Sequence, residues 1–467
     1  MKKALYIKHS GAERLAETPV RDVPLPKRLI VPAKQHAGAP CEIAVEPGAE
    51  VKKFQLLARA TEPAAADILS PAAGKIGAIL QKHPTAFGGY APAVVIETCE
   101  GEQVEREKEE DFLYCGPGRT WELITSAGIT MPPPDVRPLR AVLDPAGNCK
   151  TYNRLLVLAY DPEPMVATNR RIMFGDPESV ARGVGIVRRL LGDPHTTVVV
   201  DPADYRADVR RLTGYSEIDV VDTAPPLYPD NLPEMVIKQL YREEVPAGGS
   251  PADIGLAVIN AETALAALNA VRDGVPFTTK HVTVTGDGVT WPCIVRAPIG
   301  ATLSDLMEAC GGLKAGVEYL VMGGPMRGYA NYDRSVAVTR ETDAVLALRK
   351  RPGPPVTDTP CINCGDCVKA CPVRLQPNLL SRYCEFKLFN NAKQQHLYAC
   401  IECGMCGYVC PSRRPMLQYF RTAKVELELC AIAEAKALAE KEAIKKAEAE
   451  ADTTGDSETK EEEKSAT

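Results

Sequence analysis

Two runs of cysteines carry the strongest chemical signal in this chain. Both have the spacing C-x-x-C-x-x-C-x-x-x-C-P, and the cysteines are Cys361, Cys364, Cys367 and Cys371 in the first run and Cys400, Cys403, Cys406 and Cys410 in the second. Pro372 and Pro411 close the two runs. This spacing is typical of chains that hold two [4Fe-4S] clusters, so it indicates one-electron transfer.

The spacing also predicts how the ligands are shared. Three thiolates at intervals of three residues on a tight turn can bind three irons of one cubane, while the fourth cysteine reaches the other cluster. We therefore predict one cluster on Cys361, Cys364, Cys367 and Cys410, and a second cluster on Cys400, Cys403, Cys406 and Cys371. Gly365, Gly404 and Gly407 are expected to let backbone N–H groups approach the sulfurs, which tunes the reduction potential.

A pair of zinc sites is the alternative interpretation of these cysteines. Structural zinc sites are closed sets of four ligands, often built from two C-x-x-C pairs. Two C-x-x-C pairs are enough for such a site, so zinc binding does not account for a run of four cysteines and a proline that occurs twice. The sequence therefore favours iron–sulfur clusters.

The elements around the two runs must position these cysteines. Apolar residues at helical spacing between the runs predict helices beside the clusters, with Cys384 as a buried thiol. After Arg421 a helix rich in Ala, Glu and Lys is expected to continue to about Glu450. The acidic residues 452–467 lack core-forming side chains, which predicts disorder.

Composition limits the class of protein. The 467 residues suffice for about three or four domains, and 45% hydrophobic with 25% charged residues is ordinary for a soluble globular chain. The net charge of −6 gives no reason to expect a nucleic acid as partner. The N-terminus does not resemble a signal peptide, and no apolar run is long enough to span a bilayer. Oxygen-sensitive clusters favour a reducing cytoplasm, with any membrane association made through a partner.

Short strand-like pieces broken by Gly and Pro fill residues 29–100. Residues 45–51 and 70–76 show strand and turn patterns that predict a small antiparallel β unit. The unit looks like the barrel-sandwich hybrid of lipoyl and biotinyl carriers. Its hairpin over 61–67 contains no lysine, so a swinging arm is not expected.

Alternating strands and helices follow. Residues 154–159 and 196–200 predict buried strands with a helix over 179–191 between them, and this order favours a mostly parallel sheet. A second α+β unit is expected from residue 253 to 348, beginning with a strand over 254–259 and a helix over 261–272. A proline-rich linker then leads to the cysteine runs.

The order of these parts resembles one family, the C subunit of the Rnf electron transport complex, an ion-translocating ferredoxin:NAD oxidoreductase. The segments that carry the resemblance include residues 35–40, 246–255, 283–286 and 322–328, together with the two cysteine runs. The family's middle domain is similar to the flavin- and NADH-binding subunit of respiratory complex I. Its next domain is similar to the β-grasp fold that binds soluble ligands.

Two flavin-side motifs of the family are altered here. Where the family has a glycine-rich loop that cradles phosphates, residues 130–135 read TMPPPD, and prolines remove the N–H donors that such a loop needs. In the second motif Leu158 replaces an asparagine, whereas Asp161 and Glu163 keep carboxylates. FMN and NADH binding is therefore doubtful. Asp161 and Glu163 are either residual flavin-site residues or members of a solvated loop after a strand.

The resemblance implies an electron-transfer subunit of a membrane-bound translocase, peripheral on the cytoplasmic face of the cell membrane. Its expected partners are the other subunits of the complex and ferredoxin or another redox protein, and a partner protein is expected to deliver the electrons. One alternative is a soluble paralogue that feeds a dedicated reductase. Another is a non-catalytic scaffold that holds partners through its β-grasp domain.

The predicted fold class is multidomain α+β. The predicted divisions are an N-terminal arm (1–28), a barrel-sandwich hybrid (29–105), a complex I flavoprotein-like α/β domain (115–250), a β-grasp domain (251–348), a linker (349–356), a helical two-cluster ferredoxin domain (357–424) and a helix with an acidic tail (425–467).

Overall fold

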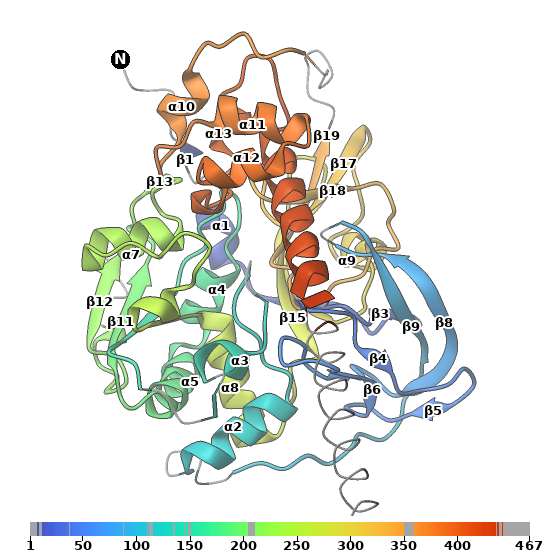
Figure 1. Ribbon diagram of the computed structural model, residues 1–467. Coiled ribbons are helices and arrows are strands. Elements are labelled where there is room, and N and C mark those ends of the chain that lie inside the picture. The colour runs from blue at the N-terminus through green and yellow to red at the C-terminus, as the bar shows by residue number, and fades with distance from the viewer. Residues whose placement is uncertain are drawn as a thin grey trace, which may run out of the picture. The chain divides into compact units, whose positions relative to one another are not determined.

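The computed structural model describes residues 7–8, 12–36, 38–86, 88–109, 111, 115–133, 136–144, 146–147, 151–203, 211–349, 359–435, 437–438 and 441 (Figure 1). The chain forms two compact units, Met1–Pro355 and Val356–Thr467. Apart from residue 349, the predicted linker lies outside the described residues, and so does the predicted acidic tail.

Two antiparallel sheets form the predicted β unit. One sheet has the order β3-β9-β8-β5, with bounds Arg28–Pro32, Tyr90–Thr98, Gly74–Pro84 and Glu50–Val51. The other has the order β4-β6-β7, with bounds Glu42–Ile43, Leu56–Arg59 and Ile68–Leu69. Aliphatic side chains such as Leu29, Leu57 and Ile96 fill the space between the sheets. The barrel-sandwich prediction is confirmed.

A four-stranded parallel sheet forms the middle of the first unit. Its order is β12-β11-β10-β14, with bounds Val220–Thr223, His195–Val200, Arg154–Leu158 and Leu256–Asn260. Strands β10 and β14 are nearly continuous apolar runs, as expected in a parallel sheet that is buried on both faces. The helices around it are α2 (Pro117–Ser126), α3 (Leu139–Leu143), α4 (Thr168–Gly175), α5 (Pro177–Leu190), α7 (Pro233–Tyr241) and α8 (Ala261–Asp273).

The predicted assignment of residues 254–259 and 261–272 to the β-grasp unit is wrong. The strand is β14, which pairs in parallel with β10 from Arg154↔Leu256 to Leu158↔Asn260. The helix is α8, which packs on α5 in the core of the same α/β domain. A strand whose side chains are all buried needs helices on both faces, and only the parallel sheet provides them.

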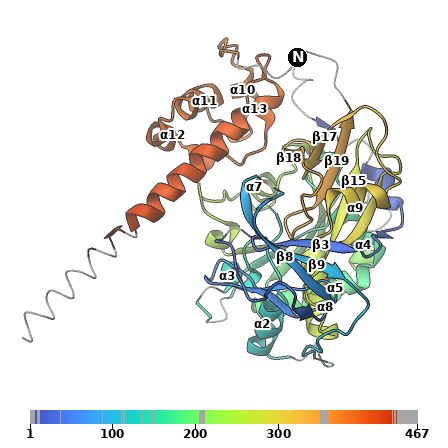
Figure 2. The same ribbon diagram turned by 90° about the vertical axis from the view of Figure 1, so that its right-hand side faces the viewer.

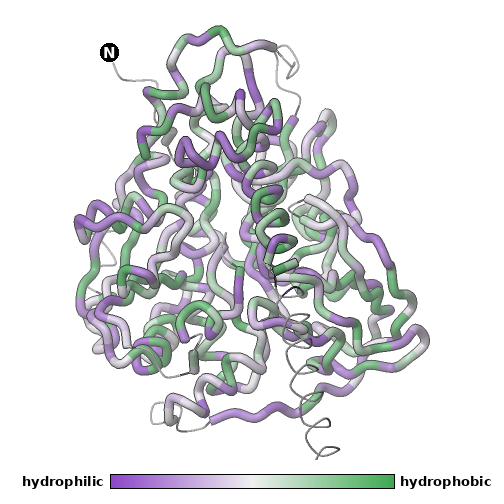
Figure 3. Tube along the Cα trace, in the orientation of Figure 1, coloured by the Kyte–Doolittle hydropathy of each residue, from purple (hydrophilic) through white to green (hydrophobic). Residues whose placement is uncertain are grey.

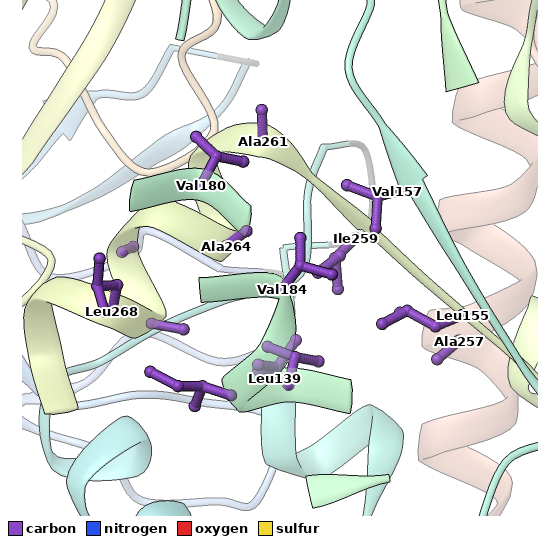
Figure 4. Packing of buried hydrophobic residues seen from close by; sticks show 14 of the residues in the cluster. Leu139, Leu155, Val157, Val180, Val184, Ala257, Ile259, Ala261, Ala264 and Leu268 are labelled. Carbon is purple, nitrogen blue, oxygen red and sulfur yellow. The ribbon is translucent and has the colours of Figure 1, made fainter. Parts of the chain in front are cut away.

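The packing of α5 against α8 leaves no room for a side chain at Gly183. Figure 4 shows Val180 and Val184 of α5 beside Ala261, Ala264 and Leu268 of α8. A Cβ at Gly183 would overlap the backbone oxygen of Ala264.

We expect Gly183→Ala to destabilise the first unit by about 1–3 kcal/mol, because overpacking forces the two helices apart. Urea unfolding followed by tryptophan fluorescence measures the loss, since both tryptophans, Trp121 and Trp291, lie in this unit. Gly118→Ala on α2 is the matched control, because a Cβ there meets nothing within 4 Å. Equal midpoints for the two variants would contradict the expectation.

The β-grasp domain is a mixed six-stranded sheet of order β18-β17-β19-β15-β16-β2. The bounds are Tyr329–Asn331, Val317–Met322, Ala344–Arg349, Thr279–Thr285, Cys293–Pro298 and Arg21–Asp22, and α9 spans Leu303–Ala309. Strand β2 comes from the predicted N-terminal arm, which also contains α1 (Ala12–Glu17). Strand β1 (Ile7–Lys8) of the arm pairs with β13 (Leu227–Tyr228). The arm is thus part of two sheets.

The second unit is helical. It contains α10 (Asp366–Ala370), α11 (Pro377–Glu385), α12 (Phe389–Gln394), a 3-10 turn (Leu397–Ala399), α13 (Met405–Tyr408) and a helix over 416–435. Figure 2 shows this last helix beside α11 and α13, and its residues Phe420 and Ala423 belong to the same buried core as Leu380 of α11. Cys384 is buried in this core, as predicted. The predicted end of the helix near Glu450 lies outside the described residues.

Polar and apolar residues are mixed along the helices (Figure 3). Within the described part of the chain, no helix has the length and apolar character needed to cross a membrane.

Candidate iron–sulfur site

Two cavities in the second unit divide the eight cysteines into the two sets that the spacing predicts. The first cavity is lined by Cys361, Cys364, Cys367 and Cys410. The second is lined by Cys371, Cys400, Cys403 and Cys406. The fourth cysteine of each run therefore faces the cavity of the other run.

The two runs share one local conformation. In each run the residue before the second cysteine is left-handed, at Asn363 (φ 55°) and Glu402 (φ 55°). The residue after it is a glycine in the same region, Gly365 (φ 80°) or Gly404 (φ 72°), and it begins the short helix α10 or α13. These reversals turn the first three cysteines of each run towards one cavity. Glycine adopts this conformation without a steric penalty, which accounts for its place after the second cysteine.

Backbone N–H groups point at several of the sulfurs. The N–H of Asn363 lies 3.4 Å from Cys361 Sγ, and that of Leu375 lies 3.3 Å from Cys371 Sγ. Burial raises the pKa of Cys406, while the N–H of Gly407 opposes this shift, in line with the role predicted for that glycine. A buried thiolate is costly without a counter-charge, and bound iron supplies one.

A charged group that the sequence did not single out lies beside the second cavity. Glu402, which lines this cavity, accepts hydrogen bonds from Arg421 Nε (2.8 Å) and Lys424 Nζ (2.8 Å) on the long helix. Lys424 Nζ also donates to the carbonyl of Cys400 (2.8 Å). The spacing of Arg421 and Lys424 puts them on one helix face, but no local pattern links them to Glu402. Charged groups beside an iron–sulfur cluster tune its reduction potential.

The two cavities differ in their access to solvent. Cys364 is exposed at the first cavity, and its neighbour Ile362 is 67% exposed. At the second cavity Cys403 and Cys406 are both buried. The first cavity is thus the one beside the surface of this unit.

Asp161, a predicted flavin-site candidate, is buried at the carboxyl end of β10. Its carboxylate accepts hydrogen bonds from Asn169 N (3.1 Å), Asn169 Nδ2 (2.9 Å) and Arg170 N (3.2 Å) at the start of α4. Burial raises its pKa to about 6, although these three donors oppose the shift. The side chain anchors α4, so the interpretation of Asp161 as part of a solvated loop is wrong.

Glu163, the second candidate, contacts the β-grasp domain. Its Oε2 accepts a hydrogen bond from Met326 N (3.1 Å), and its Oε1 lies 4.0 Å from Arg327 Nε. A Cβ at Gly324 would overlap this carboxylate, so the loop after β17 fits closely around it. Both candidates therefore have protein partners.

The start of the segment that replaces the family's glycine-rich loop is paired with the residues that follow the segment. Met131 N donates to Arg137 O (2.9 Å), and Thr130 pairs with Pro138. Pro132 and Pro133 follow Met131 in this segment, while Pro134 and Asp135 lie outside the described residues.

The carboxyl ends of β10 and β14 mark the switch point of the parallel sheet, which is where such sheets commonly bind ligands. Here a buried network of charges extends from this point. Asn169 Oδ1 accepts from Glu262 N (3.4 Å), and Glu262 is paired with Lys280, which also lies 2.8 Å from Asp343 Oδ1. Although burial alone would raise the pKa of Glu262, Lys280 and His281 hold it at about 2.

The described fold and the two cysteine-lined cavities define an iron–sulfur protein built around a complex I flavoprotein-like domain. Four family models match in succession: the RnfC barrel sandwich hybrid domain (7–101), the Nuo51 FMN-binding domain (138–269), the SLBB domain (281–330) and the 4Fe-4S dicluster domain (355–411). The chain belongs to the family of C subunits of Rnf-type ion-translocating oxidoreductase complexes.

Individual relatives agree along most of the chain. The C subunit of the proton-translocating ferredoxin:NAD(+) oxidoreductase complex of Clostridium ljungdahlii is 30% identical over 88% of this chain and 90% of its own length. The C subunit of the ion-translocating oxidoreductase complex of Rhodobacter capsulatus is 33% identical over 88% of this chain and 80% of its own. A solved NAD+-reducing [NiFe]-hydrogenase is similar at a TM-score of 0.46 and 16% identity, over 68% of this chain and 64% of that one.

Proposed function

We propose that this chain relays single electrons through two [4Fe-4S] clusters as a subunit of an ion-translocating ferredoxin:NAD+ oxidoreductase complex. The observation that carries the proposal is the division of eight cysteines between two cavities, four to each. One cluster is held by Cys361, Cys364, Cys367 and Cys410, and the other by Cys371, Cys400, Cys403 and Cys406. Each cluster supplies reversible one-electron chemistry, while the thiolates hold it and nearby N–H groups set its potential.

The proposed entry point for electrons is a partner protein, because the flavin side of the α/β domain is altered. Asp161 anchors α4 and Glu163 anchors the loop after β17, so neither carboxylate is left to orient a flavin. The prolines at 132 and 133 cannot donate N–H groups to a pyrophosphate.

The proposed place of the chain is the cytoplasmic face of the cell membrane, bound to the other subunits of the complex. Ferredoxin or another small redox protein is the proposed exchange partner. The exposed cysteine Cys364 and its exposed neighbour Ile362 support an exchange at the first cluster, since electron transfer is fastest over short distances.

NADH titration tests the proposal directly. The full chain is purified without oxygen, and the visible absorbance of the clusters is followed as NADH and then dithionite are added. We expect no bleaching by NADH and full bleaching by dithionite. Bleaching by NADH, together with bound flavin, would mean that the nucleotide site is intact and that electrons enter through it. Absence of cluster absorbance after iron and sulfide reconstitution would overturn the relay itself.

A further inference from the structure

The turn between α11 and α12 exposes two large apolar side chains. Phe386 is 69% exposed and Leu388 is 48% exposed. Their neighbours Tyr383 and Phe389 pack against the core of the second unit, so the turn is held in place while Phe386 and Leu388 face solvent. We call residues 382–393 the α11–α12 corner. Adjacent large apolar side chains that stay exposed on an anchored turn are typical of a contact surface.

Three cations accompany these apolar side chains. Arg382, Lys387 and Lys393 are all exposed. Among the described residues, none of the three side chains forms an ion pair, because the carboxylate of Glu385 turns to Arg414 instead (2.6 Å). The corner therefore presents uncompensated positive charge beside an apolar centre.

The domain that holds the cysteines is basic as a whole. Residues 359–424 contain nine Lys or Arg and three Asp or Glu, although the net charge of the chain is −6. Each of the three carboxylates is paired with a Lys or Arg side chain. Opposite potentials steer the association of two proteins, so this domain favours a partner with an acidic surface.

Lys387 occupies a backbone position that favours glycine. Its φ is 56°, its N–H donates to Cys384 O (3.1 Å), and the N–H of Leu388 donates to Tyr383 O (2.8 Å). These are the two hydrogen bonds of a Schellman motif, in which the left-handed residue is usually glycine. Glycine would avoid the steric cost of this conformation. A lysine at this position places a charge beside Phe386 at the expense of stability, which points to a role outside folding.

The corner belongs to a segment that begins and ends at the second cavity. Cys371 before it and Cys400 after it both line that cavity. Leu380 of α11 lines it too, and a helix advances about 9 Å over the six residues from Leu380 to Phe386. A protein docked on the corner is therefore close to the second cavity, whereas the exposed Cys364 lies at the first.

We propose that the α11–α12 corner is the docking surface of an acidic electron-transfer protein that exchanges electrons with the second cluster. This inference rests on the proposed function, because it names where one partner of the relay binds. Phe386 and Leu388 form the apolar centre of the contact, and the three cations around them pair with carboxylates of the partner. Electron-transfer complexes bury little surface, so a patch of this size suffices. One electron passes between the reduced partner and the oxidised cluster, and no bond forms or breaks.

Anaerobic surface plasmon resonance tests the docking. The full chain with its clusters is immobilised, and an acidic [2Fe-2S] ferredoxin is the probe. The variants are Lys387→Gly, which removes the charge and relieves the backbone, and Phe386→Ser, which removes the apolar centre. Arg242→Gly is the matched control, because Arg242 is also an exposed, left-handed cation at the end of a helix, α7 of the first unit.

We expect the association rate constant of the wild type to fall at least tenfold between about 20 mM and about 300 mM ionic strength, over which the Debye length shortens from about 20 Å to about 6 Å. Lys387→Gly should associate at least threefold more slowly at the lower ionic strength. Its cluster absorbance should be unchanged and its urea midpoint equal to or above that of the wild type, because glycine relieves the strain. Phe386→Ser should dissociate at least fivefold faster. Arg242→Gly should bind as the wild type does.

The proposal is overturned if Lys387→Gly and Phe386→Ser both bind as the wild type does, or if Ile362→Ser at the first cavity loses the binding that they keep. It is also overturned if the chain binds single-stranded DNA or phosphatidylserine vesicles more tightly than it binds ferredoxin at the same ionic strength. Clusters that bleach with dithionite in a chain that does not bind ferredoxin would refute the docking surface alone. Clusters that do not form, or do not bleach with dithionite, would refute the relay.

Discussion

Replacing Cys371 by serine is expected to remove the cluster in the second cavity while the cluster in the first cavity survives. Cys371 belongs to the first run in sequence, but it lines the cavity of Cys400, Cys403 and Cys406. Serine is a poor ligand for these irons, so the affected cubane should lose iron or be lost entirely. Iron content should fall from about eight to about four per chain, or to about seven if a three-iron cluster is left.

Cys410→Ser should have the reciprocal effect, because Cys410 lines the first cavity. Electron paramagnetic resonance of the dithionite-reduced protein tells the two apart, since each variant keeps a different cluster signal. Cys384→Ser is the matched control, as this thiol is buried in the same core but lines neither cavity. If Cys371→Ser instead removed the signal that Cys361→Ser removes, the crossed ligand sets would be wrong.

Lys280→Met should destabilise the first unit by about 3–5 kcal/mol, the usual cost of removing one partner from a buried ion pair. The side chains of Lys280 and Glu262 are only 2% and 4% exposed. Without the ammonium, the Glu262 and Asp343 carboxylates are left buried with no comparable counter-charge. Urea unfolding followed by tryptophan fluorescence measures the loss.

The pH dependence of this loss has a definite sign. In the wild type the pKa of Glu262 is held at about 2, below its usual 4.5, so its stabilising contribution is complete above pH 4.5 and is lost as pH falls through about 2. In Lys280→Met burial raises the pKa of Glu262, so this carboxylate takes up a proton as the pH falls. The difference between variant and wild type should therefore narrow from pH 8 to pH 5.

Arg296→Met is the matched control for Lys280→Met. Arg296 pairs with Asp22, but the two side chains are 53% and 67% exposed, so this pair is worth at most about 1 kcal/mol. A second variant, Lys280→Met with Glu262→Gln, should recover part of the stability because it removes the unpaired charge. Equal losses for Lys280→Met and Arg296→Met would show that the buried network contributes little.

The division of the cysteines between the two cavities could be predicted from sequence because it depends on local geometry. The spacing of Cys361, Cys364 and Cys367 limits which sulfurs can share one cubane, whatever surrounds them. The domain order could also be predicted, since each domain has its own pattern of strands and helices. The left-handed conformation of Glu402 could not, because glutamate has no preference for that conformation and only the closed loop imposes it.

Contacts between segments that are far apart in the chain could not be predicted from the sequence. Strand β14 is apolar enough to belong to either neighbouring domain, and only its pairing with β10 decides between them. Asp161 lies shortly after the end of β10, which suggested a loop position, yet its carboxylate accepts hydrogen bonds at the start of α4, several residues later. Lys280 and Glu262 lie on different elements, and nothing local indicates that their charges meet.

The exchange of Cys371 and Cys410 between the two cavities also affects how the protein matures in a cell. Under the proposed ligand sets, the first cubane cannot be completed until Cys410 has been synthesised, although its other three ligands leave the ribosome earlier. The second cubane needs Cys371 from the earlier run, so it depends on that run remaining reduced while the chain grows. Iron–sulfur assembly factors would therefore act on a nearly complete chain and mature both centres at the same late stage.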